Sequence, residues 1–483
     1  MKWIFLSFIF WSQLLWAGLT PLDLLEQTIK HNQKVQLAYM DYEIALAEKG
    51  GAMKDLDWNI ALAGYLDNAN TKQNVTYDNG SVREIERSYS LGFTKTFATG
   101  TRLQTSYQAI STSSSSRNTI APTYYQSALQ FGVRQPLLRG ANKESLFNEY
   151  MKADFKIKRY IAKYYKTLVR QYTKVVEKYL DFTTKSLELK NREKAIKFYA
   201  DTFLYTQKAQ KVGRKSQVDL VEVKAKLKRE EALLLKNQSE LNILKNDLNS
   251  LCRLSVKPED LTQESLLNFF QLISGYYNRD MKIDKLPAVM EKLMSYSETK
   301  VDIDKYKNQL MPELNLELTY TGQGLGTTSQ IASDQVKNFD YAELSIALTL
   351  NWDIENLTNR GNYQRYQAMG VRKNLDYQKQ VFQEQNRMQV DFAQNDAKLE
   401  VSKLKKAMYQ DSLELLDFHL KSFRLGRISF LKLEEEQNSI EEDILSYYKT
   451  FSETSLSLLK LWVRSHKFFN KAHKISGLNF IAD

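Results

Sequence analysis

The sequence predicts a mixed, mainly α-helical fold, in which a tunnel of long antiparallel coiled-coil α-hairpins joins a transmembrane β-barrel. Three observations lead to this prediction: a motif that occurs twice, two long stretches with few helix-breaking residues, and segments in which apolar and polar residues alternate. The motif reads Val212-Gly213-Arg214 in its first copy and Leu425-Gly426-Arg427 in its second, 213 positions later. Such a repeat indicates an internal duplication, and we expect each glycine to mark the turn of a helical hairpin.

The long helices are predicted by the scarcity of proline and glycine. Between Pro136 and Pro258 the chain has no other proline and only two glycines, Gly140 and Gly213. Residues 371–476 contain one glycine, Gly426, and no proline. A helix over residues 142–212 would be about 71 residues and roughly 105 Å long at 1.5 Å per residue. This is far longer than the average helix of a globular protein.

The arm that follows each turn carries a heptad pattern. In the first copy the repeated position holds Leu220, Leu227, Leu234, Leu241 and Leu248, and in the second Leu433, Ile440, Tyr447, Thr454 and Leu461. Glu230 and Asn237 interrupt the companion position of the first copy. The pattern predicts coiled-coil packing with one imperfect seam. A leucine heptad alone is also typical of simple dimerisation.

Segments of alternating polarity precede each long helical stretch. In the first half they cover residues 58–67, 88–94 and 125–134, with an extra hairpin over 88–110, and in the second half 314–320 and 343–352. In a secreted chain, ten-residue strands with one apolar face are typical of an outer-membrane barrel with a wet lumen. A soluble sandwich is the alternative, but the five large apolar residues between Leu344 and Trp352 favour lipid. Trp58 and Trp352 would then share one rim as an aromatic girdle.

The glycine-rich run over residues 322–326 lies in a segment, 321–339, that we expect to be a polar surface loop. Because we expect no helix after it, the run does not predict a nucleotide-binding loop. Four strands in the first half and two in the second are too few to close a barrel. Open edges in a bilayer would leave backbone groups unpaired at a cost of several kcal/mol each. The chain is therefore expected to oligomerise.

The N-terminus predicts export, and the rest of the chain offers no chemistry. Lys2, the apolar stretch from Trp3 to Trp16, and Ala17 with Gly18 are typical of a secretory signal peptide. The net charge of +11 is spread along the predicted helices, so with an exported chain we expect no nucleic-acid partner. Cys252 cannot form an intramolecular disulfide, and we expect it to be a core residue. The four histidines lack metal-ligand spacing, and there is no nucleophile elbow or P-loop, so we expect no enzyme, metal or cofactor.

With these features the chain resembles the TolC-like outer-membrane efflux protein family, from Leu19 to about Trp462. The resemblance rests on the two glycine turns, on the strand-to-helix junction Gln135 to Gly140, and on its weaker partner Trp352 to Gly361. It implies a homotrimer whose barrel crosses the outer membrane and whose helical tunnel extends into the periplasm. The implied partners are outer-membrane lipid, a periplasmic adaptor (membrane fusion protein) and an inner-membrane pump or ABC transporter. Three copies would give 12 strands, or 18 if the hairpin over 88–110 joins the wall.

The resemblance also implies roles for particular residues. The adaptor-contacting tips would be Val212, Gly213, Arg214, Leu425, Gly426 and Arg427. The periplasmic gate would lie just after the turns, where the family often has carboxylates. Glu435 matches this pattern, Lys432 stands at another acidic position, and Asp219 and Glu222 hold the corresponding places in the first copy. A ring of Lys432 would partly offset a ring of Glu435.

We therefore expect a passive export duct, part of a tripartite efflux pump or a type I secretion system and driven by the inner-membrane transporter. The alternative is a non-conducting, envelope-spanning coiled-coil tether, and a general porin would have no need for helices of this length. The expected segments are a signal peptide (1–17), an N-terminal periplasmic helix (18–56), first-repeat barrel strands (57–137), a first helical hairpin (138–253), a periplasmic equatorial connector (254–285), a leading helix (286–312), second-repeat barrel strands (313–353), a second helical hairpin (354–465) and a C-terminal tail (466–483).

Overall fold

The computed structural model describes residues 19–72, 81–114, 123–141, 143–258, 261–276, 281–425 and 427–478. The predicted signal peptide and Gly426 lie outside the described residues. The chain divides into two compact units. A sheet unit contains residues 43–159 and 292–377, and a helical unit contains residues 1–42, 160–291 and 378–483.

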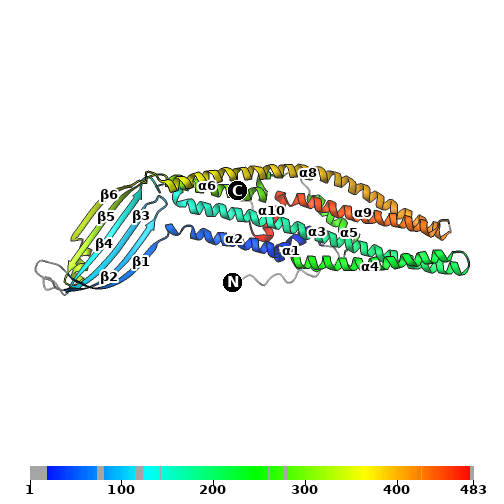
Figure 1. Ribbon diagram of the computed structural model, residues 1–483, viewed down its shortest axis with the longest axis horizontal. Helices are drawn as coiled ribbons and strands as arrows, with labels where there is room; N and C mark the ends of the chain where they lie inside the picture. Colours follow the sequence, from blue (N-terminus) through cyan, green and yellow to red (C-terminus); the bar gives the residue numbers. More distant parts are fainter. Residues whose placement is uncertain are drawn as a thin grey trace. The chain divides into compact units, whose positions relative to one another are not determined.

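The sheet unit is built on one six-stranded antiparallel sheet in which every strand pairs with its neighbour in sequence (Figure 1). The strands are β1 (Asn59–Lys72), β2 (Ser81–Thr96), β3 (Arg102–Ser114), β4 (Thr123–Pro136), β5 (Glu313–Gly326) and β6 (Tyr341–Asn351). The prediction of four strands in the first half and two in the second is confirmed. The hairpin over 88–110 forms parts of β2 and β3. Each of these strands pairs with a neighbour on both sides, so the hairpin is an integral part of the sheet.

The uninterrupted register gives the sheet one apolar and one polar face, because side chains alternate along each strand. One row of partners on the apolar face holds Ile60, Phe93, Thr105, Phe131, Tyr320 and Leu344. The next row, on the other face, holds Ala61, Gly92, Ser106, Gln130, Thr321 and Glu343. Leu344, Ile346, Leu348 and Leu350 of β6 are each at least 60% exposed in the single chain.

The expectation of a polar loop without a helix over 321–339 is wrong. β5 continues to Gly326, and helix α7 (Ser329–Asn338) follows. The side chain of Thr328 caps α7 by accepting the N–H of Ile331, and Ala332 and Val336, one turn apart, are buried. The glycine run lies within a strand and leaves room for α7, because a Cβ at Gly324 would lie 2.0 Å from the carbonyl oxygen of Ala332.

Three residues at the junction between β4 and α3 donate hydrogen bonds to the second half of the sheet unit. The N–H of Leu137 donates to the carbonyl of Leu314 at 2.7 Å, and that of Arg139 to Pro312 at 3.2 Å. The N–H of Gly140 donates to Oδ1 of Asn308 at 3.1 Å. The long helix α3 (Lys143–Lys211) begins here beside α6 (Pro287–Gln309), to which it is joined by ion pairs such as Lys152 with Asp302 at 2.7 Å. The duplicated halves therefore meet where strands become helices.

The helical unit contains two long hairpins, each of which pairs a descending and a returning helix (Figure 1). α3 has 69 residues and returns as α4 (Gln217–Cys252), and α8 (Leu357–Arg424) has 68 residues and returns as α9 (Phe430–Trp462). The helix predicted over 142–212 is confirmed to within a residue at each end. α1 (Pro21–His31), part of α2 (Gln33–Gly51), α5 (Gln263–Tyr276) and α10 (His466–Ser476) complete this unit.

An aromatic core joins the helices of this unit. Tyr172 of α3 stacks on Phe468 of α10 with ring centroids 5.8 Å apart, and Tyr276 stacks on Trp462 at 4.8 Å. The Tyr172 hydroxyl donates to the carbonyl of Pro21 at 2.6 Å, which satisfies its polar atom inside the core. Cys252 is fully buried in the same cluster, as predicted.

We predict that Gly100, in the turn between β2 and β3, cannot carry a side chain. Its φ is +83°, and a Cβ would lie 2.5 Å from the carbonyl oxygen of Gly140 and 2.6 Å from Cγ of Pro136. Gly100→Ala should therefore destabilise the sheet unit by about 2 kcal/mol and lower the melting temperature in detergent. Gly50→Ala is the control, because nothing lies within 4 Å of a Cβ there. Equal melting temperatures for the two variants would contradict the packing described here.

Candidate functional site

The first hairpin turn closes with two backbone bonds that define a Schellman motif. The N–H of Gly213 donates to the carbonyl of Gln210 at 3.0 Å, and that of Arg214 to Ala209 at 2.8 Å. Gly213 has a φ of +74°, which only glycine adopts at little cost, and open space surrounds it. Val212 beside it is 69% exposed. The turn therefore presents an apolar side chain and accessible backbone.

The second turn repeats this geometry. The N–H of Arg427 donates to the carbonyl of Ser422 at 2.9 Å, the pair that corresponds to Arg214 and Ala209 after the shift of 213 positions. Leu425 is 67% exposed, like Val212 in the first copy. Gly426 itself lies outside the described residues. The internal duplication predicted from the sequence thus extends to the hydrogen bonds of the turn.

The residues predicted for the gate differ between the copies. In the first copy, Asp219 closes a capping box: its Oδ2 accepts the N–H of Ser216 at 2.9 Å, and its own N–H donates to Oγ of Ser216 at 3.0 Å. The backbone bond from Ser216 lowers the pKa of Asp219. Asp219 is therefore held as a helix cap, and Glu222 one turn later is half-buried. The S-x-x-D spacing is a capping signal that the sequence analysis did not use.

In the second copy Lys432 takes the place of Asp219, so Ser429 caps α9 without a reciprocal carboxylate. The Lys432 ammonium lies 2.9 Å from Glu436 and 3.4 Å from Glu435. The side chain of Glu435 is 71% exposed in the single chain, whereas that of Glu436 is 30% exposed. Lys432 thus pairs mainly with Glu436, and Glu435 keeps a freely accessible carboxylate.

Just behind the turns the two hairpins pack on each other through a small apolar cluster. It consists of Ala195, Tyr199, Val223, Phe423, Phe430 and Leu433. The Lys215 ammonium of the first turn lies over the Phe423 ring, 4.7 Å from its centroid. The cluster and this cation–π contact hold the two turns as one tip.

A buried ion cluster follows the apolar one. Glu230 of α4, with 2% of its side chain exposed, accepts from Arg192 of α3 at 2.7 Å and lies 3.3 Å from Lys226. Arg192 also lies 3.5 Å from Glu441 of α9, and Lys226 lies 3.4 Å from Glu434. The heptad interruption at Glu230 therefore holds the two cations, Arg192 and Lys226, that reach the second hairpin. Asn237, the other interruption, donates to Glu188 of α3 at 3.0 Å.

The sequence analysis did not identify Arg192, Lys226 or Glu441 as partners. Glu230 and Asn237, two polar residues on an otherwise apolar seam, could have indicated such partners. A charge at such a position is stable only when a neighbouring helix supplies the opposite charge. Burial, together with the nearby Glu230, raises the pKa of Glu441.

Each hairpin has a second apolar seam that is exposed among the described residues. On α8 the exposed residues Val401, Leu404, Met408, Leu415 and Phe418 follow a heptad spacing, and on α4 Val218, Val221, Leu235 and Ile243 are more than half exposed. A coiled coil with apolar residues on both sides needs a further helix on each side.

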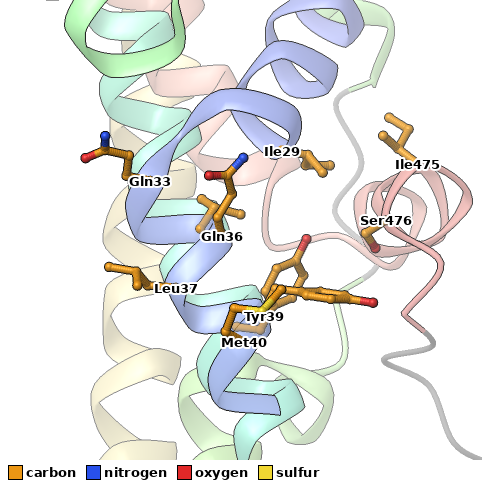
Figure 2. A pocket seen from close by; sticks show the side chains of 10 residues that line it. Ile29, Gln33, Gln36, Leu37, Tyr39, Met40, Ile475 and Ser476 are labelled. Carbon is orange, nitrogen blue, oxygen red and sulfur yellow. The ribbon is translucent and has the colours of Figure 1, made fainter. Parts of the chain in front are cut away.

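A separate groove of about 640 Å³ lies between α2 and the end of α10 (Figure 2). Leu37 and Met40 line one side and are 66% and 50% exposed, and Ile475 with Ser476 lines the other. Its lining contains no charged side chain, which is a poor fit for ionic ligands.

Neither a membrane-spanning helix nor a metal-binding cluster occurs among the described residues. No helix among them is both long and apolar enough to cross a membrane. No group of three or more His, Cys, Asp and Glu side chains within the described ranges is arranged to hold a metal ion.

We predict that Glu441→Gln stabilises the helical unit at neutral pH. Burial raises the folded-state pKa of Glu441, so the ionised carboxylate destabilises the fold. The contribution of the protonated carboxyl to stability is present below the ordinary glutamate pKa. It is lost as the pH rises through the raised pKa. At pH 7.5 the variant should therefore melt at a higher temperature than the parent, by the equivalent of about 1 kcal/mol, with little difference near pH 4. Glu442→Gln, at an exposed neighbouring position, is the control. A lower melting temperature for Glu441→Gln at pH 7.5 would contradict this account.

The chain is similar to known proteins in its fold. No protein-family model matches the chain, and no curated protein matches it in sequence. Solved structures do match. The outer-membrane protein VceC from Vibrio cholerae aligns with a TM-score of 0.60 and 12% identity over 95% of this chain and 97% of its own. The CmeC outer-membrane channel of Campylobacter jejuni aligns with a TM-score of 0.62 and 11% identity over 96% and 87%. The MtrE outer-membrane channel of Neisseria gonorrhoeae, in its open state, aligns with a TM-score of 0.61 and 11% identity over 93% and 89%. The chain therefore has the fold of the TolC-like outer-membrane channels.

Proposed function

We propose that the chain forms a homotrimeric outer-membrane channel, the passive export duct of a tripartite efflux pump or a type I secretion system. A periplasmic adaptor would connect it to an inner-membrane transporter, which would supply the energy. The observation that carries this proposal is the six-stranded sheet, which has one apolar face, one polar face and two edges without partners. The similarity of fold to outer-membrane channels supports it. The division into segments predicted from the sequence is part of the same proposal.

The two open edges support a barrel made by several chains. Within the described residues β1 pairs only with β2, and β6 pairs only with β5. An apolar face suits lipid, but unpaired edges do not, so copies would join β1 to the β6 of a neighbour. Three copies would give 18 strands. At a strand spacing of ~4.8 Å and a tilt of ~40°, that barrel would be about 36 Å across between backbones.

The uncovered seams on α4 and α8 support a ring of hairpins. In a threefold assembly each chain would give two hairpins, and the outer seam of one would pack on a hairpin of the next. A tether would need the helices but not the polar strand face, and a porin would need the strands but not the hairpins.

The exposed turn residues support an adaptor site at the tips. Val212 and Leu425 present apolar side chains to solvent, and Gly213 with Arg214 presents accessible backbone and a positive charge. Arg427 stands in the second copy where Arg214 stands in the first. Hydrophobic anchors beside an arginine are typical of binding surfaces.

Single-channel recording tests the duct against the tether. Purified protein in a planar bilayer should produce discrete steps of ionic current, since a closed barrel with a polar lumen conducts. A protein that inserts at full density and leaves the bilayer insulating would favour the tether.

We predict that Glu435 and Lys432 set the ion preference of the closed tunnel in opposite directions. Three copies of each around a threefold axis would place two charged rings near the periplasmic mouth. In a salt gradient, Glu435→Gln should shift the reversal potential toward anions and Lys432→Gln toward cations. If neither variant moves the potential, these side chains do not face the conducting path.

We predict that bulky residues at the turns abolish export without disturbing assembly. Both Gly213→Trp and Gly426→Trp are introduced, because each hairpin has its own tip. Gly477→Trp is a matched control: Gly477 also has a positive φ, +75°, with nothing within 4 Å, but ends α10 and not a hairpin. The tip variant should lose at least about tenfold in export, equivalent to ~1.4 kcal/mol of adaptor binding. Full export by the double variant would refute the adaptor site.

A further inference from the structure

Helix α7 lies on the apolar face of the sheet and not on its polar face. Cβ atoms built at Gly322, Gly324 and Gly326 would each meet α7 or the Phe339 that ends it, at 2.8 Å, 2.0 Å and 2.8 Å. These even-numbered positions of β5 share a face with Leu316, Leu318 and Tyr320, because the register has no bulge between them. The Phe339 ring lies 5.5 Å from that of Tyr320. α7 is therefore on the same side of the wall as the leucines.

Helix α7 also accepts a hydrogen bond from β5 at a position where β6 provides no partner. β6 begins at Tyr341, which pairs with Gln323, so β5 has no strand partner on that side beyond Gln323. The N–H of Leu325 donates instead to Oε1 of Gln335 in α7, at 2.8 Å. Beyond the end of β6, α7 thus satisfies one N–H on the edge of β5, a group that would cost free energy if it were left unpaired in a bilayer.

The level of α7 along the wall matches the outer boundary of a membrane. Trp352, just after β6, and Ala342, which pairs with Gly322 beneath Phe339, are ten residues apart. That is about 33 Å along a strand, or about 25 Å along the barrel axis at a tilt of ~40°. The apolar band of an outer-membrane barrel is about 25 Å tall and ends in aromatic girdles. Trp58 and Trp352 would mark one boundary, and Phe339 with α7 the other.

The two sides of α7 differ as an interface requires. Ala332 is fully buried and Val336 is 2% exposed against the glycine-rich strand, while Ile331 on the flank is 46% exposed. Asp334 and Lys337 point away from the sheet as an ion pair of 3.3 Å, with side chains 52% and 73% exposed. The buried side of α7 therefore faces the sheet, and Ile331 on the flank is the large apolar side chain that α7 leaves exposed beside the apolar face of the wall.

We propose that α7 is an interfacial helix that binds the outer lipid surface from outside the wall. It lies along the sheet with Ile331 toward acyl chains and its charged side toward headgroups, and it fixes the depth of the barrel in the bilayer. This rests on the proposed function only in that the apolar face must contact lipid. A helix that instead constricted the lumen would lie on the opposite face, beside Gln323.

Nitroxide labels on introduced cysteines test this proposal in vesicles of phosphatidylethanolamine and phosphatidylglycerol. Ile331→Cys reports on α7, Ile346→Cys on the apolar face of β6, and Gln323→Cys on the polar face. The native Cys252 is buried, and the labelled parent chain measures its background. Collisions with oxygen should exceed those with an aqueous nickel chelate at 331 and 346, with a ratio at least about threefold higher than at 323.

The controls separate this proposal from the function on which it rests. A nickel-dominated label at 331 beside an oxygen-dominated label at 346 would overturn the placement of α7 alone. A nickel-dominated label at 346 would overturn the membrane-embedded wall, and the interfacial helix with it.

A steric variant provides a second test. Gly324→Leu should lift α7 from the strand and bring the oxygen-to-nickel ratio at 331 down by at least about threefold, while 346 keeps its value. Gly64→Leu is the matched control: Gly64 lies on the same face, on β1, where a Cβ would meet nothing closer than 3.7 Å. An unchanged ratio at 331 in folded Gly324→Leu protein would contradict the close packing of α7.

Discussion

The unpaired backbone groups along β1 and β6 are the constraint on which the rest of the molecule depends. Each edge strand presents a row of N–H and C=O groups that a single chain cannot satisfy in lipid, where water is absent. The apolar face of the sheet is stable in contact with lipid, but the edges are not stable there until another copy pairs with them. Folding of the wall, membrane insertion and assembly are therefore coupled in the proposed channel, and the helices that continue from the strands inherit the same symmetry.

In the helical unit the corresponding constraint is charge burial between hairpins. The apolar cluster around Tyr199 and Phe430 would hold two hairpins in several rotational settings, because hydrophobic contact is not directional. The almost fully buried Glu230 carboxylate holds Arg192 and Lys226, and these two cations in turn reach Glu441 and Glu434 of α9, an arrangement that these ion pairs allow in one setting. The polar residues that weaken the coiled-coil pattern thus fix which faces of α3, α4 and α9 meet. The capping box at Ser216, the Schellman bonds of the first turn and the matching bond from Arg427 to Ser422 in the second fix where the helices reverse.

Periodicity predicted most of this fold, because it reflects burial directly. The alternating segments form β1 to β6, the helix over 142–212 is α3, and the two glycine motifs lie at turns that share the backbone bond from Arg214 to Ala209 and from Arg427 to Ser422. The pattern failed over residues 321–339, where glycines that usually mark a loop form the seat of α7. Their role depends on a helix that begins three residues after Gly326, and the local sequence pattern does not reveal that contact. For the site, the spacing of the repeat predicted the two turns. It did not predict that Asp219 caps a helix while Lys432 forms an ion pair, because these contacts depend on neighbours that come together in the folded hairpin.

The number of chains per barrel tests the central claim most directly. Protein extracted in a mild detergent and measured by light scattering with the detergent contribution subtracted should have about three times the 56.3 kDa chain mass, less the signal peptides. A monodisperse species of one chain mass that retains the circular dichroism of a β-barrel would contradict the account, because six strands with open edges would then be stable without partners.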